Sequence, residues 1–281
     1  MDNNKVDMTS NLNQIKFDPK KSQDRCIQYR KKILDISQQV SALHGGGALS
    51  VLEIVDFIYY GLIYSEKKSD KNNTFIMSKG HGCMAQYVTL NKLGILSDKD
   101  LDDYCKPNGI LGCHPDYGNP GIEASTGSLG HGMGIAVGMA HYEKIKNTNN
   151  KIFVVISDGE LQEGSTWEAM MMAANLELDN LVCFLDHNGS QSFGHTIETH
   201  PKFYPIKDKV SAFNWGCNKA NGHDVNDLAT AYSACNNSNK PHMIICDTVK
   251  GRGVSFMENK PIWHYRAPNN EEYIKAIKEL G

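Results

Sequence analysis

The chain has 281 residues, 40% of them hydrophobic, which is enough for one large domain with a sizeable buried core. Its 29 basic and 32 acidic side chains give a formal net charge of −3, which argues against a general nucleic-acid or membrane-surface binder. The amino terminus is polar, and no run approaches the roughly 20 apolar residues of a membrane span, so we expect a cytoplasmic protein.

The eight cysteines are scattered and form no Cys-x-x-Cys pair. Cys183 and Cys246 fall inside apolar runs, where small buried thiols are common. This pattern predicts free thiols in a reducing compartment, and the spacing does not support a zinc site.

The first part of the chain carries helix signals. Residues 1–17 are rich in Asn, Asp and Lys and predict a flexible amino-terminal arm, followed by a single domain over 18–281. Asp18-Pro19 marks the start of a long helix to about Ser41. The run Gly45-Gly46-Gly47 is expected to end that helix.

Three later segments have a Ser followed three residues on by an acidic residue, the pattern of a capping box at a helix start. Ser50 with Glu53 predicts an apolar helix. Ser97 with Asp100 predicts a short helix that begins after Gly94, where the preceding helix is expected to end. Ser165 with Glu168 predicts a helix in the centre of the chain.

The second half alternates buried strands with helices. Three short apolar runs are typical of parallel strands covered on both faces, at 151–157, 181–185 and 243–246. A helix is expected from Val225 to about Asn236, and the tail after residue 270 has helical spacing. The alternation predicts an α/β fold, a doubly wound and mostly parallel sheet flanked by helices.

Polar residues follow two of these strands at their carboxyl ends, where open α/β sheets bind ligands. Asp158-Gly159 comes after the first strand, and Asn188 comes after the second. A carboxylate, an amide oxygen and the backbone carbonyl of Ser190 would make a hard-oxygen set for Mg²⁺, and Gly159 would let a diphosphate approach the backbone. The alternative is that Asp158 and Asn188 only cap a helix and a turn.

Asp-Gly followed about thirty residues later by Asn resembles the thiamine diphosphate motif of a broad enzyme superfamily. The segment Asp158–Gly164, followed by Trp167-Glu168-Ala169, resembles the transketolase family in particular. Further segments match that family in its order over roughly residues 25–270: His44–Ser50, Ser78–His81, Gly112–Asp116, Pro120–Gly132, Thr248–Gly253 and Trp263-His264.

The resemblance implies thiamine diphosphate and Mg²⁺ as cofactors and a role for several histidines. Ketol transfer moves protons on and off sugar oxygens, which imidazoles can do near neutral pH. For an arbitrary histidine the ordinary alternative is a satisfied structural or surface residue. By resemblance, the catalytic residues are His44, His81, His114 and His264. The cofactor-binding residues are His81, Gly127, Ser128, Leu129, Asp158, Gly159, Glu163, Asn188 and His264, and the metal ligands are Asp158, Asn188 and Ser190.

Some positions depart from the family pattern. Leu43 stands where Gly usually precedes His44, Ser157 where Gly precedes Asp158, and Tyr265 where Gly follows His264. Phe193 stands where an Asp is common. Leu43 and Tyr265 lie beside the expected substrate contacts, so an altered sugar preference is a hypothesis.

The largest departure is length, because a full transketolase also has a pyrimidine-binding and a carboxyl-terminal domain. The chain therefore resembles the amino-terminal subunit of a split transketolase that transfers a two-carbon ketol unit between sugar phosphates. This implies a heterotetramer with a separate carboxyl-terminal partner subunit.

Two other functions stay open at this point. One is another thiamine diphosphate enzyme, such as the alpha subunit of a 2-oxo acid dehydrogenase or a deoxyxylulose phosphate synthase. The Ser-Lys-Gly-His and Trp-His segments disfavour the dehydrogenase. The other is a paralogue that binds cofactor or partner without turnover, which the presence of Asp158, Asn188 and all four histidines disfavours.

Overall fold

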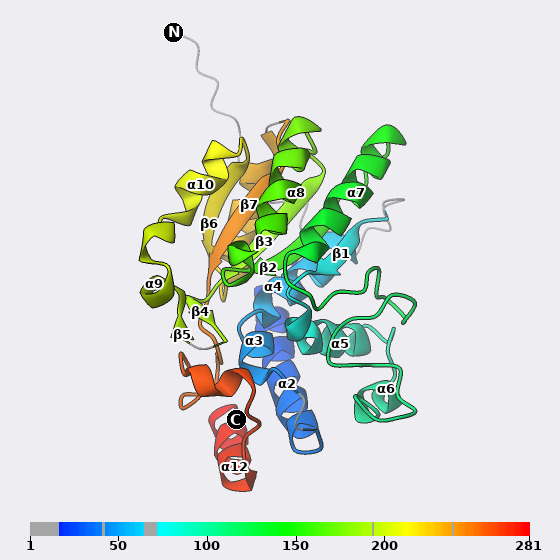
Figure 1. Ribbon diagram of the computed structural model, residues 1–281. Coiled ribbons are helices and arrows are strands. Elements are labelled where there is room, and N and C mark those ends of the chain that lie inside the picture. Colours follow the sequence, from blue (N-terminus) through cyan, green and yellow to red (C-terminus); the bar gives the residue numbers. More distant parts are fainter. Residues whose placement is uncertain (1–16, 41–42, 65–71, 193, 238) are drawn as a thin grey trace.

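The computed structural model describes residues 17–40, 43–64, 72–192, 194–237 and 239–281. Its centre is a five-stranded sheet in which every pairing is parallel and the strand order is β1-β2-β3-β7-β6 (Figure 1). A separate antiparallel pair joins β4 to β5. The strands are β1 (Thr74–Met77), β2 (Ile152–Ser157), β3 (Leu181–His187), β4 (Ser190–Gln191), β5 (Gly194–His195), β6 (Gly216–Asn221) and β7 (His242–Asp247).

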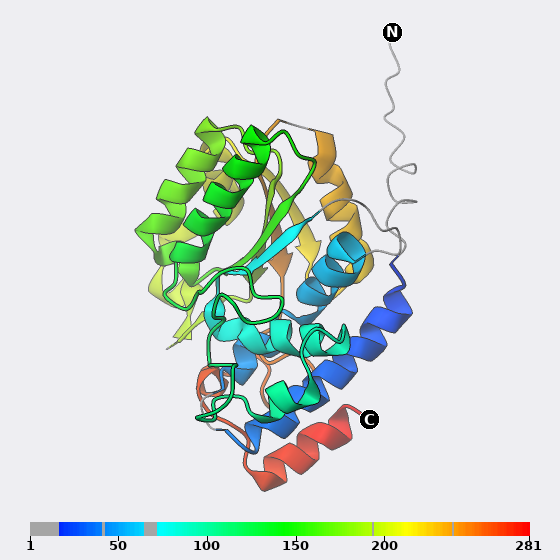
Figure 2. The same ribbon diagram turned by 90° about the vertical axis from the view of Figure 1, so that its right-hand side faces the viewer.

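Helices cover both faces of the sheet, so the α/β doubly wound prediction is confirmed. Figure 2 shows the green helices α7 and α8 on one face and α11 with the blue segment η1 on the other. The helices are α2 (Pro19–Ser37), α3 (Gly45–Leu49), α4 (Leu52–Asp56), η1 (Phe57–Ile63), η2 (Gly80–Gly82), α5 (Cys83–Lys92), α6 (Asp98–Asp102), α7 (His131–Ile145), η3 (Glu160–Gln162), α8 (Gly164–Asn175), α9 (Thr196–Thr199), η4 (Pro201–Phe203), α10 (Ile206–Ala212), α11 (Val225–Ser233), η5 (Ala234–Asn237), η6 (Pro261–His264) and α12 (Asn270–Glu279).

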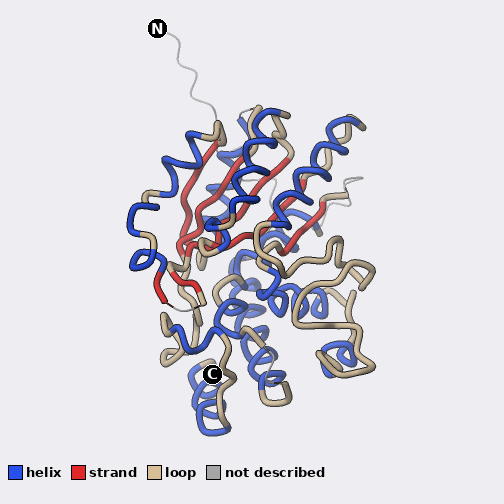
Figure 3. The backbone as a smooth tube through the Cα atoms, in the orientation of Figure 1, coloured by secondary structure: helices blue, strands red, loops and turns tan. Residues whose placement is uncertain are grey.

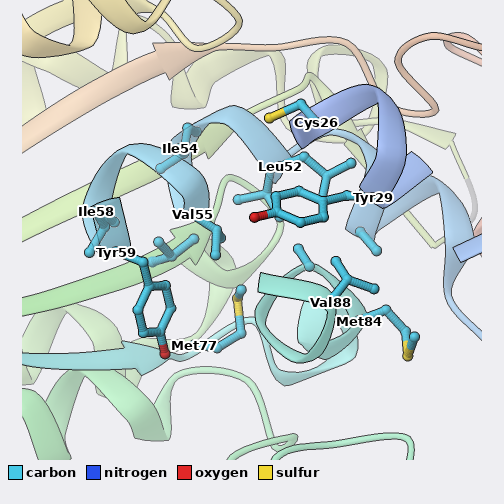
Figure 4. Close-up of a cluster of buried hydrophobic side chains, with 14 of the residues drawn as sticks. Cys26, Tyr29, Leu52, Ile54, Val55, Ile58, Tyr59, Met77, Met84 and Val88 are labelled. Atoms are coloured by element: carbon cyan, nitrogen blue, oxygen red, sulfur yellow. The ribbon is translucent and has the colours of Figure 1, made fainter. Parts of the chain in front are cut away.

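The sheet separates two hydrophobic cores, because successive strand side chains point to opposite faces. In β2, Phe153 and Val155 pack into the core that includes η1 and α11, whereas Val154 and Ile156 pack into the core beneath α7 and α8. Figure 4 shows part of the larger core, where side chains of α2, α4 and α5 meet. The continuous apolar run of β2 therefore reflects a strand covered on both faces.

Below the sheet lies a second, mostly helical region made of α2, α3, α5, α6 and α12 (Figures 1 and 3). Of the arm predicted at 1–17, residues 1–16 lie outside the described residues, and the ring of Phe17 packs edge-on against Phe57. The described chain contains no helix that is both long and apolar enough to cross a membrane. All eight cysteines are free thiols; most are buried and Cys105 is exposed.

Two of the helix predictions at the amino-terminal side are confirmed. Asp18 accepts hydrogen bonds from two backbone amides at the start of α2, and Ser97 forms a reciprocal capping box with Asp100 at the start of α6. The long helix ends at Ser37, four residues before its expected end at Ser41.

Three local details differ from the predictions, namely one helix end and two N-caps, whereas the helices predicted after Ser50 and near Ser165 are present as α4 and α8. Gly45–Gly47 begin helix α3 instead of ending α2, and a Cβ on Gly46 would lie 2.9 Å from the carbonyl oxygen of Trp263. Ser50 does not cap α4, because its hydroxyl donates to the buried carboxylate of Asp186. Helix α8 begins at Gly164 without a side-chain cap from Ser165. Gly46 and Ser50 thus serve tertiary contacts.

Candidate functional site

Loops that follow adjacent parallel strands meet at one edge of the sheet. Ser157 at the end of β2 is in register with Asp186 of β3, and His187 of β3 is in register with Asp247 of β7. The segments that begin at Ser78, Asp158, Asn188 and Thr248 therefore leave the sheet side by side. Ligands of open α/β sheets bind at this edge.

A cavity of about 420 Å³ lies between these loops and the helical region. Its lining contains most of the residues that the sequence singles out: His44, His81, His114, Gly127, Leu129, Gly159, Glu163, Asn188, Ser190 and His264. Asp158 is buried next to this lining, and Ser128 is exposed and is not part of it. The fold thus gathers residues from seven separate segments into one space.

The segments after β2 and β3 are held together through Asp158. One oxygen of its carboxylate accepts from the amide of Gly159 at 3.0 Å, and the other accepts from the amide of Gly189 at 2.6 Å. A Cβ placed on Gly159 would lie 3.9 Å from the carbonyl oxygen of Ser190, so that carbonyl borders the same space. Burial raises the pKa of Asp158 to about 6, and the nearby carboxylate of Asp186 adds to the shift.

This donor set fits a divalent cation. A buried carboxylate, the side-chain oxygen of Asn188 and a backbone carbonyl are hard oxygen ligands of the kind Mg²⁺ prefers. Positive charge beside Asp158 would offset the burial that disfavours its ionised form. Among the described residues no group of three His, Cys, Asp or Glu side chains is placed to hold a metal, so a cation here would depend on the mixed set.

Asp186 holds the amide of Asn188 in one orientation. The side-chain nitrogen of Asn188 donates to Asp186 at 3.0 Å, and an ionised carboxylate can only accept. The same carboxylate accepts from Ser50 at 2.7 Å, and also from Lys79 and Thr248. Burial opposes its charged form, but the Lys79 ammonium and the hydrogen bonds from Lys79, Thr248 and Ser50 together outweigh burial and lower the pKa of Asp186. The oxygen of Asn188 is therefore directed away from Asp186.

The four histidines predicted as catalytic form one cluster. The ring centroid of His44 lies 5.7 Å from that of His81, 6.1 Å from that of His114 and 5.3 Å from that of His264. Burial lowers the pKa of His44, and it lowers that of His81 further with the help of the Lys79 ammonium. Nδ1 of His44 is buried and has no hydrogen-bond partner among the described residues. Burial thus favours the uncharged form of His44 and His81, which both line the cavity.

Lys250 is a functional candidate that the sequence did not single out. Its ammonium lies 2.8 Å from Nδ1 of His264 and 3.2 Å from the carbonyl oxygen of Gln191. Burial, together with Lys79, lowers the pKa of Lys250 to about 8. Burial and the Lys250 charge lower the pKa of His264 to about 3. The sequence feature that could have identified Lys250 is its position inside the matching segment Thr248–Gly253.

The loop Gly127–Leu129 is shaped by close contacts. Gly127 has φ +146°, and a Cβ there would lie 2.9 Å from Cγ of His114. At the end of the loop, the amide of Gly130 donates at 2.9 Å to the buried carboxylate of Glu160, which also accepts from Ser78. Glu160, another residue that was not singled out, therefore ties this loop to the segment that carries His81.

Comparisons with known proteins identify the family of this chain. A family model described as "Transketolase, thiamine diphosphate binding domain" matches residues 22–281. An apulose-4-phosphate transketolase subunit of Phocaeicola vulgatus is 38% identical over 256 residues, which are 90% of this chain and 91% of that protein. The 6-deoxy-6-sulfo-D-fructose transketolase subunit SqwG of a Clostridium species is 35% identical over 89% of this chain and 93% of that protein.

Solved structures show the same fold. Transketolase from Campylobacter jejuni has a TM-score of 0.87 at 26% identity and covers 94% of this chain, whereas this chain covers 43% of that one. The chain thus matches transketolase subunits along nearly their whole length and spans less than half of this solved transketolase chain. The chain belongs to the transketolase family, as an amino-terminal subunit that carries the thiamine diphosphate binding domain.

Proposed function

We propose that this chain, together with a second polypeptide, transfers a two-carbon ketol unit from a ketose phosphate to an aldose phosphate. The observation that carries the proposal is that four clustered histidines and a hard-oxygen set border the same cavity. The relatives support a sugar substrate, because they are named as transketolase subunits for apulose 4-phosphate and 6-deoxy-6-sulfo-D-fructose.

Thiamine diphosphate and Mg²⁺ are the proposed cofactors. Asp158, Asn188 and the carbonyl of Ser190 would hold Mg²⁺, and Gly159 leaves room for the diphosphate. The loop Gly127–Leu129, with Glu163 and His81, would contact the rest of the cofactor. When bound, thiamine diphosphate supplies the nucleophilic carbon that ketol transfer requires.

The histidines are proposed to handle the sugar's oxygens and their protons. His44, His114 and His264 would contact the reacting end of the substrate, and His81 and His264 would also reach the cofactor. A neutral imidazole presents one donor and one acceptor, so this set can hold hydroxyl groups and exchange protons with them. The donor's hydroxyl loses a proton as its carbon–carbon bond breaks, and the acceptor's carbonyl oxygen gains one.

The proposed partner is a carboxyl-terminal transketolase subunit with a pyrimidine-binding domain, in a heterotetramer located in the cytoplasm. Because relatives that this chain matches over 91% and 93% of their length are named as transketolase subunits, a second polypeptide would supply the rest of the enzyme. Purification of the tagged chain from its own host, with mass spectrometry of any stoichiometric companion, tests this assembly. A lone chain that retains no thiamine diphosphate would contradict it.

Substitution of Asp158 tests the cofactor site. In the assembled enzyme, Asp158→Ala is expected to abolish cofactor-dependent ketol transfer and to weaken binding of thiamine diphosphate with Mg²⁺ in calorimetry. Asp208→Ala, at an exposed position on α10, is the matched control and is expected to bind normally. Unchanged cofactor affinity in Asp158→Ala would refute the metal assignment.

A further inference from the structure

Two of the departures from the family pattern, Ser157 and Tyr265, line the histidine cavity. Leu43 is buried in the hydrophobic core, Phe193 lies outside the described residues, and the Ser157 hydroxyl accepts from the amide of Glu160. Ser157 is only 5% exposed, whereas Tyr265 has 54% of its surface exposed. Its place at the rim makes it the residue best positioned to meet an entering substrate.

The ring of Tyr265 packs against two of the histidines proposed for the reacting end. Its centroid lies 4.3 Å from that of His264 and 5.3 Å from that of His44, both in edge-to-face geometry. The hydroxyl donates to the hydroxyl of Ser192 at 3.2 Å. Contacts on both sides hold the ring in one place at the rim.

Tyr265 and Ser192 also line a second hollow of about 540 Å³, together with Pro261, Ile262 and Arg266. The two residues are thus shared by this outer hollow and the histidine cavity of about 420 Å³. Replacing Tyr265 with alanine would remove a ring that lines both the outer hollow and the histidine cavity. The space available beside His44 and His264 would then extend outward.

We infer that Tyr265, held by Ser192, is a specificity-determining residue that limits the bulk a substrate can carry next to its reacting carbonyl. The inference rests on the proposed ketol transfer and names a steric property of its substrates. The ring touches the histidines at the reacting end, so the atoms it excludes are those adjacent to the reacting carbon. Acceptors that carry one carbon substituent on the carbon beside the carbonyl, as aldoses do, are favoured over acceptors that carry two.

The test uses two unphosphorylated 2-hydroxyaldehyde acceptors, 2-hydroxypropanal and 2-hydroxy-2-methylpropanal, which differ by one methyl group beside the carbonyl. Both are assayed with one ketose phosphate donor in the assembled two-chain enzyme, and kcat/KM is compared. One carbon in a shaped pocket changes kcat/KM by about 10–200-fold. The native enzyme is expected to prefer 2-hydroxypropanal, and Tyr265→Ala is expected to reduce that preference by about tenfold.

Two further variants test whether the ring of Tyr265 itself causes the preference. Tyr265→Phe keeps the ring and is expected to keep most of the preference. Tyr142→Ala removes an exposed tyrosine near the end of α7, outside the cavity, and is expected to leave the preference unchanged. Thermal unfolding checks that each variant is folded.

The possible outcomes are distinct. A lower preference in Tyr265→Ala alone supports the inference. A preference that is equal in the native enzyme and Tyr265→Ala overturns it while ketol transfer stands. Absence of any ketol transfer by the native two-chain enzyme refutes the proposed function. The inference about Tyr265 rests on that function and is then refuted as well.

Discussion

The ammonium of Lys250 lies 2.8 Å from Nδ1 of His264, and both side chains are buried. A charged ammonium has only donors, so Nδ1 must be the acceptor and the ring proton must sit on Nε2. The same charge, together with burial, keeps the pKa of His264 near 3. Lys250 therefore fixes the tautomer of His264 and adds to the burial that keeps the ring uncharged.

Removal of this cation should raise the pKa of His264. In Lys250→Met the ring loses the positive neighbour that opposes its protonation, so its pKa is expected to rise from about 3 toward its ordinary value of 6.5. NMR titration of the histidine resonances measures this change, with Lys260→Met, at an exposed position, as the control. We expect ketol transfer to fall by about 100-fold, the low end for a positioned proton-transfer group. An unmoved His264 titration would contradict the assignment.

Mg²⁺ binding should weaken in acid because of Asp158. Its folded-state pKa of about 6 lies above the ordinary 3.8, so the carboxylate carries a proton below pH 6 and a metal must displace it. Affinity is expected to be flat above pH 6 and to fall by about tenfold per pH unit below it. Calorimetry of Mg²⁺ in the presence of thiamine diphosphate at pH 5 and pH 7 measures the slope. Asp158→Asn should remove the slope, and equal affinity at both pH values would refute the prediction.

The ion pair between Lys79 and Asp186 is fully buried and should be costly to break on one side only. Lys79→Met leaves an unpaired buried carboxylate, and Asp186→Asn leaves an unpaired ammonium. Each is expected to lower the free energy of unfolding by about 3–5 kcal/mol. The double variant should lose clearly less than the sum of the two, because neither charge then remains. Urea unfolding of all four proteins measures the coupling, and strictly additive losses would show that the pair is not coupled.

Gly127 should not tolerate a side chain. Gly127→Ala places a methyl group 2.9 Å from Cγ of His114 at a φ of +146°, so the loop or the imidazole must move. The NMR resonances of His114 are expected to shift, and kcat/KM of the assembled enzyme is expected to fall at least about tenfold. Gly134→Ala on α7 is the control, since no atom lies within 4 Å of its added Cβ. This control should leave the His114 resonances in place, and a native spectrum in Gly127→Ala would refute the clash.

The strands that the sequence predicted and those it did not predict differ in how they pack. β2, β3 and β7 are buried on both faces and appear as continuous apolar runs, which is why they could be located. β1 has four residues and β6 is a mostly polar edge strand, so neither carries a periodic signal. Long strands that are covered on both faces can be recognised from the sequence. Short or edge strands form by pairing with neighbouring strands and cannot be recognised from their own residues.

The sequence by itself determined the fold class and the identity of most groups around the cavity, because apolar runs, glycines and histidines in family order are local patterns. Only the tertiary structure showed which of those groups lie in contact and how each contact affects charge state and tautomer. Lys250 and His264 are fourteen residues apart, and Lys79 and Asp186 are more than a hundred apart. Their charge states and tautomers depend on distance and burial in three dimensions, and spacing along a chain encodes neither.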